Sequence, residues 1–310
     1  MKALSPFAGL AVAEIDRRLA GPGLRWRSGP FVIQLRARNI PRLGEQLAFL
    51  YAAHPVIDPP WEEVADTHLD LIRSGGWRRW WRAQAIMEED GARPLQPFPL
   101  DHALPLFEWG WNFIIASRGN RYLMLHTAAL SPDGERALIL PGLPGSGKST
   151  LAAALALRGW RLLSDEFALV RPEDGRVMPL ARPVALKNSS IEVIRDFDPK
   201  AEFGPLFPKT RKGTVAHLKP PPASVAAMDR SCRPAWVVTP RFESGAGASL
   251  QPMAPEAAFL MIAANAFNYE VQGELGFQAV ARIVRNCTIH TLTFGDLSEA
   301  VALLAELVAS

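Results

Sequence analysis

Hydrophobic positions in the first third of the chain recur mostly at the spacing of short strands, with one helical stretch. Leucines at intervals of three and four residues predict an amphipathic helix over 40–50. The dipeptide Asp90-Gly91 lies between two apolar stretches and is typical of a hairpin turn. We therefore expect a β-rich α+β module here, with strands at 31–36, 68–73, 80–87 and 93–98.

The rest of the chain alternates apolar strand-like runs with longer helical stretches, which is the pattern of an α/β fold. The sequence over 131–134 (Ser-Pro-Asp-Gly) predicts a hairpin between the first two of these strands. Prolines interrupt regular structure within 99–121, which places a domain boundary between a module over 1–115 and a domain over 116–310. Strands are predicted at 122–126, 137–140, 161–163, 167–170, 235–238 and 288–294, and helices at 106–117, 149–158, 255–267, 275–285 and after Asp296.

One loop carries the strongest functional signal. Between the apolar run 137–140 and the predicted helix 149–158, the chain matches the phosphate-binding pattern G-x-x-x-x-G-K-[ST] at every fixed position. In such a loop, backbone N–H groups converge on phosphate oxygens, Lys148 reaches the β- and γ-phosphates, and the Ser149 hydroxyl ligates magnesium. The sequence therefore predicts that ATP and Mg²⁺ bind here, with contacts from Gly142, Leu143, Pro144, Gly145, Ser146, Gly147, Lys148, Ser149 and Thr150.

An acidic pair follows soon after this phosphate-binding loop. Asp165 and Glu166 come just after the apolar run 161–163, and Asp165 lies only seventeen residues beyond Lys148. Phosphoryl transfer needs carboxylates that ligate the metal and accept the proton of the attacking hydroxyl. The spacing is shorter than in many phosphate-loop proteins, and it predicts that both side chains serve the site as catalytic groups and metal ligands.

Two further features are weaker candidates for the site. His126 ends a predicted strand that the hairpin would bring beside the phosphate-binding loop, but a histidine on an apolar strand can equally be a core residue. In the loop 208–217, Arg211 and Lys212 could neutralise charge on a transferred phosphoryl group or could form a solvated basic loop; we favour the first. The segment 187–190 is better explained as the N-cap of the helix that follows.

Composition limits the class of protein. A chain of 310 residues that is 48% hydrophobic and 21% charged, with a net charge of +3, is typical of a globular protein and gives no indication of nucleic-acid binding. Cys232 and Cys287 form no disulfide or zinc motif, which favours reduced thiols and a cytoplasmic location. Without a signal-peptide pattern or 18 consecutive apolar residues, we expect no membrane association. The segment 77–82 could form a basic aromatic surface, but we favour packed indoles with exposed arginines.

Taken together, three segments resemble the catalytic core of bacterial HPr kinase/phosphorylase, and most closely HPr kinase-related proteins, including kinases associated with peptide modification. They are 125–130, 142–150 and 158–166, within a similarity over about 120–220. The resemblance implies a mixed-sheet α/β fold related to that of phosphoenolpyruvate carboxykinase. It also implies that Asp165 is a general base or metal ligand and that His126 orients the groups around it.

The chain departs from that family at several positions. The paired aspartates of the family appear as Asp165-Glu166, Thr150 replaces a glutamate, and neither the phosphorylase signature nor the family's N-terminal domain is found. The resemblance therefore implies a kinase that transfers the γ-phosphoryl group of Mg-ATP to a serine of a protein or peptide. The module over 1–115 would select this acceptor. A small-molecule kinase and a nucleotide-responsive binding module without transfer are the alternatives, and homo-oligomerisation stays open.

Overall fold

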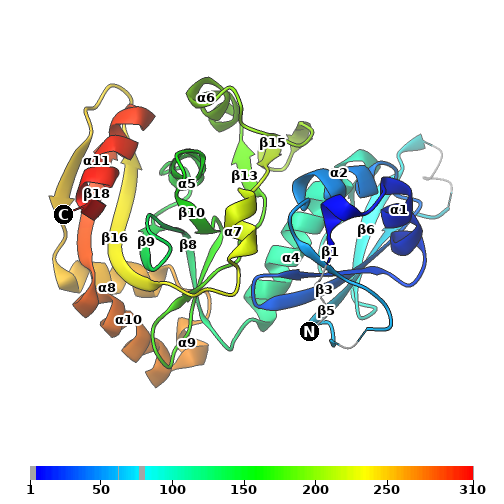
Figure 1. Cartoon of the computed structure of the whole chain (residues 1–310), viewed down its shortest axis with the longest axis horizontal. Helices are drawn as coiled ribbons and strands as arrows, with labels where there is room; N and C mark the ends of the chain where they lie inside the picture. The colour runs from blue at the N-terminus through cyan, green and yellow to red at the C-terminus, as the bar shows by residue number, and fades with distance from the viewer. Residues whose placement is uncertain (1–4, 62, 77–80, 310) are drawn as a thin grey trace.

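Three β-sheets organise the part of the chain that the structure describes, which is residues 5–61, 63–76 and 81–309. In this computed structural model, a seven-stranded sheet with its helices forms a first unit, and an eight-stranded sheet with helices on both faces forms a second unit (Figure 1). A three-stranded sheet, which we count with the second unit, lies between the two larger sheets in this view. The chain is thus a mixed α/β protein, as the sequence predicted.

The sheet of the first unit has the strand order β1-β4-β2-β3-β5-β6-β7. Only β3 and β5 pair parallel among its described neighbours. The predicted turn at Asp90-Gly91 follows β6, with both residues at positive φ, but the predicted strand 93–98 is wrong. Prolines in that stretch lack the N–H group that a ladder needs, so pairing is confined to the short β7. The strands are β1 (Ser5–Pro6), β2 (Leu24–Ser28), β3 (Phe31–Arg38), β4 (Pro55–Ile57), β5 (Thr67–Arg73), β6 (Gln84–Glu89) and β7 (Phe98–Pro99).

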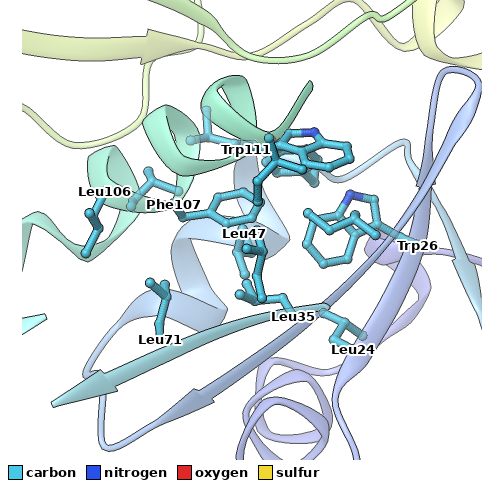
Figure 2. Close-up of a cluster of buried hydrophobic side chains, with 14 of the residues drawn as sticks. Leu24, Trp26, Leu35, Leu47, Leu71, Leu106, Phe107 and Trp111 are labelled. Atoms are coloured by element: carbon cyan, nitrogen blue, oxygen red, sulfur yellow. The ribbon is translucent and has the colours of Figure 1, made fainter. Parts of the chain in front are cut away.

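A core of leucines and aromatic rings fills the space between this sheet and its helices (Figure 2). Trp26, Phe107 and Trp111 are almost fully buried, and each ring of this size contributes roughly 1.5–3 kcal/mol by its burial. The helix α4 (Ala103–Arg118), the last of this unit, spans the predicted domain boundary between residues 115 and 116, and Ile115 still belongs to this core. The helices are η1 (Phe7–Gly9), α1 (Val12–Ala20), α2 (Leu43–Leu50), η2 (Leu100–His102) and α4 (Ala103–Arg118).

The sheet of the second unit has the order β12-β11-β8-β9-β16-β18-β17, and β10 also pairs with β8. The predicted hairpin at 131–134 is confirmed, because β8 and β9 pair antiparallel and the Ser131 hydroxyl accepts the N–H of Gly134 at 2.9 Å. β9, β16 and β18 run parallel. The strands are β8 (Leu123–Ser131), β9 (Arg136–Pro141), β10 (Arg161–Ser164), β11 (Phe167–Val170), β12 (Val177–Met178), β16 (Arg233–Phe242), β17 (Ser249–Pro252) and β18 (Thr288–Phe294).

Both faces of this second sheet are covered by helices, which explains why its central strands are continuously apolar. On β9, Leu138 and Leu140 belong to the core under α5 and α11, whereas Ala137 and Ile139 belong to the core under α8 and α10 (Figure 1). The helices are α5 (Lys148–Leu157), α6 (Ser189–Phe197), α7 (Pro222–Ala226), α8 (Pro255–Ala264), α9 (Tyr269–Gln272), α10 (Glu274–Asn286) and α11 (Leu297–Ala309). The three-stranded sheet has the order β13-β15-β14, with β13 (Val184–Lys187), β14 (Phe207–Thr210) and β15 (Gly213–Leu218).

The two units pack directly against each other. Phe167, Leu180 and Phe207 of the second unit belong to the same hydrophobic cluster as the core of the first unit. At Gly29, in the turn between β2 and β3, a Cβ would clash with the carbonyl oxygen of Pro179, and φ is +59°. Glycine is therefore required where this turn meets the second unit.

Several surface predictions can be compared with the structure. Residues 77–80 of the basic aromatic segment lie outside the described residues, and Trp81 is 84% exposed, so for this indole the packed interpretation is wrong. Cys232 and Cys287 are free thiols. Among the helices of the described ranges, none combines the length and the apolar character needed to cross a bilayer.

Candidate active site

The phosphate-binding loop joins the end of β9 to the start of α5. β9 ends at the buried Pro141, and α5 begins at Lys148, so the loop runs from the end of a strand to a helix N-terminus. Gly145 and Gly147 have φ values of +86° and +91°, which glycine adopts without steric cost. A Cβ at position 147 would also lie 3.1 Å from the ring of Phe294. The strand, loop and helix context that phosphate binding requires is therefore present.

Lys148 is folded over its own loop. Its ammonium group donates hydrogen bonds to the carbonyl oxygens of Gly142 and Leu143, the second at 3.0 Å. Burial, together with the charge of Lys187, lowers the pKa of Lys148 below its ordinary value, while the acidic pair opposes this shift. The Ser146 hydroxyl is buried without a hydrogen-bond partner among the described residues. Phosphate oxygens would give both groups stronger, charge-assisted partners.

Strand β8 brings distant parts of the chain to this loop. On one side it pairs with β9, with Thr127 opposite Pro141, so that His126 lies beside the start of the loop. On the other side it pairs with β10 and with β11, and His126 is opposite Phe167. The acidic pair lies where the chain passes from β10 to β11 and therefore reaches the same part of β8 as the loop.

The environment of Asp165 favours the protonated carboxyl. Burial and the charge of Glu166 raise the pKa of Asp165 to about 7, while the Ser149 hydroxyl, the charge of Lys187 and the backbone N–H of Ala185 partly offset this. Its Oδ1 atom is buried without a hydrogen-bond partner in the described part of the chain. A carboxyl that titrates near neutral pH is suited to accept a proton from a hydroxyl group.

His126 lies beside the acidic pair as a neutral ring. Its Nε2 atom is 3.7 Å from Oε1 of Glu166, which is too long for a hydrogen bond. Burial lowers the pKa of His126 below its ordinary value; Glu166 opposes this, and the neighbouring lysines add to it. The ring also packs against Phe267, with 5.2 Å between centroids. At neutral pH, His126 can therefore orient a ligand by hydrogen bonding, mainly as the neutral ring.

Two lysines reach the acidic pair from the three-stranded sheet. Lys187 ends β13, Lys212 lies in the turn between β14 and β15, and both line the same narrow cavity as Asp165 and Glu166. The Lys212 ammonium lies 4.9 Å from the ring centroid of Trp109. Burial and the charge of Lys187 lower the pKa of Lys212. This pair of cations is placed where charge on a phosphoryl group could be neutralised.

The structure places two predicted features differently. Arg211 is exposed, its guanidinium lies 5.9 Å from the ring centroid of Phe98 in the first unit, and it is not among the residues that line the cavity. Asn188 does not cap α6 with its side chain; instead its Oδ1 accepts the N–H of Thr214 at 3.0 Å and ties the start of α6 to β15. Asn188 therefore occupies the predicted N-cap position of α6 but makes no side-chain cap, and this interpretation obscured Lys187. A lysine at the end of an apolar strand was the signal that could have identified it.

The oxygen atoms around Asp165 fit a magnesium ion. Carboxylate and hydroxyl oxygens are the ligands that Mg²⁺ prefers, and Asp165, which lies close to the Ser149 hydroxyl, has a buried oxygen without a partner among the described residues. Within the described ranges, no group of three or more His, Cys, Asp or Glu side chains could hold a metal ion alone. Phosphate oxygens complete the coordination shell of magnesium in phosphate-loop enzymes. A set of protein ligands made of Ser149, Asp165 and Glu166 therefore needs no third carboxylate.

The narrow cavity connects this site with the first unit. Its volume is about 30 Å³, which is room for about one water molecule. Asp165, Arg182 and Lys187 line it from the second unit, and Glu108 and Asn112 line it from α4. The first unit therefore forms one wall of the candidate site.

The structure thus brings His126, Lys148, Ser149, the acidic pair and Lys212 to one place and leaves Arg211 apart. Thr150 is half-buried in the first turn of α5. No protein-family model matches the chain, and a search of curated proteins finds no match.

Replacing Lys187 by methionine is expected to lower the turnover of γ-labelled ATP about ten- to a hundred-fold, because the site loses a cation while a side chain of similar volume remains. The structural effect should be small, since Lys187 is half-buried at the end of its strand. Release of labelled phosphate measures the effect, and Lys200→Met, at an exposed position, is the matched control. Equal turnover in the two variants would remove Lys187 from the site.

Proposed function

We propose that this protein is an ATP-dependent kinase of the HPr kinase-related type, which transfers the γ-phosphoryl group of Mg-ATP to a hydroxyl, namely a serine of a protein or peptide. Asp165 acts as the base in this proposal, and Lys148, Lys187 and Lys212 surround the transferred group. The nature of the acceptor rests on the resemblance of three segments to that family. The phosphoenolpyruvate carboxykinase-like fold belongs to the same proposal.

One observation supports the proposal more than any other. A carboxyl whose pKa is raised to about 7 lies beside the serine of a phosphate-binding loop, although the two come from different strand connections. A structural carboxylate would be paired or exposed, whereas Asp165 keeps a buried oxygen atom that no group in the described part of the chain hydrogen-bonds. This combination of a triphosphate cradle and a base is what phosphoryl transfer requires and what nucleotide binding alone does not.

The proposed reaction assigns one task to each group. The acceptor hydroxyl gives its proton to the Asp165 carboxylate, and its oxygen forms a bond to the γ-phosphorus. The bond from that phosphorus to the β,γ-bridging oxygen breaks, and ADP leaves with the electron pair. Lys148 and the loop N–H groups hold the phosphates, and Lys187 and Lys212 stabilise the negative charge. Magnesium, when bound, would neutralise phosphate charge.

The acceptor is tested with γ-labelled ATP, magnesium and a lysate of the source organism. We expect label to appear in a protein or peptide band with the wild-type chain and to be absent with Asp165→Asn. Label confined to a small metabolite would instead favour the small-molecule kinase. Tight ATP binding without transfer to any acceptor or to water would favour the nucleotide-responsive module.

A further inference from the structure

A buried ion pair joins the first unit to the chain segment beside the candidate base. Nη2 of Arg182 donates to Oε2 of Glu108 at 2.6 Å, and the side chains are only 8% and 5% exposed. Nη1 of Arg182 donates to Oδ1 of Asn112 at 2.6 Å, and the Tyr51 hydroxyl donates to the other oxygen of Glu108 at 2.7 Å. Three residues of the first unit therefore hold one arginine of the second.

The same segment has a second anchor on the first unit. The Nε2 atom of His54 lies 3.0 Å from the carbonyl oxygen of Ala181, the residue directly before Arg182. Burial lowers the pKa of His54 to about 3, so this neutral ring donates an N–H to the carbonyl. Adjacent positions of the segment are thus fixed by α4 and by the chain that follows α2.

From these anchors the chain runs directly to the candidate base. Pro183 follows Arg182 and restricts its backbone to extended conformations, and β13 then carries Ala185 and Lys187. Ala185 and Lys187 line the same narrow cavity as Asp165, so this segment forms part of the wall around the candidate base. β13 is an edge strand that pairs only with β15 among the described strands. The position of its unpaired edge is therefore held by contacts other than strand pairing.

We propose that Glu108 and Asn112, acting through Arg182, are positioning residues that hold the segment 182–187 against Asp165, so that the first unit is a required part of the phosphotransfer site. This inference rests on the proposed function for its consequence in turnover. This positioning role of the first unit differs from selection of the acceptor, because the contacts of the first unit reach the groups around the base. They are not confined to the outer wall of the cavity.

The chemistry of the pair separates positioning from stability. Removing one partner leaves a buried charge unpaired, which destabilises the fold whatever the pair does for the site. Replacing both partners by apolar side chains of similar size is often neutral for stability. The double variant Glu108→Leu/Arg182→Met should therefore keep the melting temperature but lose the directed contacts that fix the segment.

The experiment compares this double variant with the wild type in three measurements: melting temperature, affinity for ATP, and turnover of γ-labelled ATP with water or lysate protein as acceptor. We expect a near wild-type melting temperature, an unchanged ATP affinity and a turnover about ten- to a hundred-fold lower, because small displacements of reacting groups have effects of this size. The exposed pair Glu192 and Arg195 on α6, replaced as Glu192→Leu/Arg195→Met, is the matched control. Wild-type turnover in the Glu108→Leu/Arg182→Met variant would overturn the proposal.

Two further measurements keep the inference testable. If the double variant does not fold, Asn112→Ala removes one contact of Arg182 and should lower turnover to a smaller extent with unchanged ATP affinity; unaltered turnover in this variant would count against the positioning role. If the wild type shows no turnover at all, the proposed function fails. Hydrogen exchange over 183–187 then decides the positioning role alone: faster exchange in the variant supports it, and unchanged exchange overturns it.

Discussion

Asp165→Asn is expected to reduce phosphoryl transfer by about 10²–10⁴-fold while ATP still binds, because an amide of the same shape cannot accept the acceptor's proton. The surroundings of Asp165 that favour this role are its burial and the neighbouring charge of Glu166. Transfer is measured with γ-labelled ATP, and binding with a non-hydrolysable ATP analogue. Undiminished transfer in the variant would remove Asp165 as the base.

The same substitution should stabilise the protein without ligands. Since burial raises the pKa of Asp165 from 3.8 to about 7, the folded chain holds a proton that the unfolded chain has released between these values. The free energy of unfolding of the wild type therefore falls as pH rises from about 4 to about 7. We expect Asp165→Asn to remove this loss. The variant should therefore exceed the wild type in free energy of unfolding by about 2–4 kcal/mol at pH 8, and by close to zero below pH 4.

The check is a pair of thermal unfolding series over pH, for the wild type and for Asp165→Asn, in the absence of nucleotide and magnesium. The gain in melting temperature should grow as pH rises and level off above pH 7. Asp196→Asn, at an exposed position of α6, is the matched control against which the growth is judged. A gain that is the same at every pH would contradict the assigned titration.

Lys148→Met is expected to lower ATP affinity about ten- to a hundred-fold. The ammonium now bonds neutral loop carbonyls, and phosphate oxygens would replace them with charged acceptors, a difference of about 1.5–3 kcal/mol for hydrogen bonds to charged groups. Calorimetric titration with a non-hydrolysable ATP analogue and magnesium measures this loss. Lys200→Met is the control, and equal affinities in the two variants would contradict nucleotide binding at this loop.

The conformation of the loop between β9 and α5 was predictable because its signals are local. A strand buried on both faces must be continuously apolar, glycines mark positive φ, and good helix formers follow within the same short stretch. The hairpin at 131–134 is equally local, since the Ser131 hydroxyl and the Asp133 carboxylate bond to backbone N–H groups within a few residues. These interactions form in nearly any tertiary context.

Other parts of the site depend on contacts between residues far apart in the chain. Lys187 was misjudged because nothing near it indicates that β13 ends beside Asp165, and because the side chain of Asn188, at the N-cap position of α6, bonds across to β15 instead of to the helix. Arg211 and Lys212 are adjacent, yet the turn between β14 and β15 directs one toward Phe98 of the first unit and the other into the cavity. Adjacent residues of a turn have no periodicity from which their direction could be predicted.

By itself, the sequence determined the conformation of the loop between β9 and α5, this strand and this helix, because each depends on backbone preferences over a few residues, and it placed the acidic pair close to the loop along the chain. Only the tertiary structure decided that β8 brings His126 between the loop and the acidic pair. It also decided that Glu108 of α4 forms an ion pair with Arg182 beside the cavity. Burial is a property of the assembled core, and it raises the pKa of Asp165 because residues distant in sequence exclude water from this carboxyl, while the neighbouring charge of Glu166 raises the pKa further.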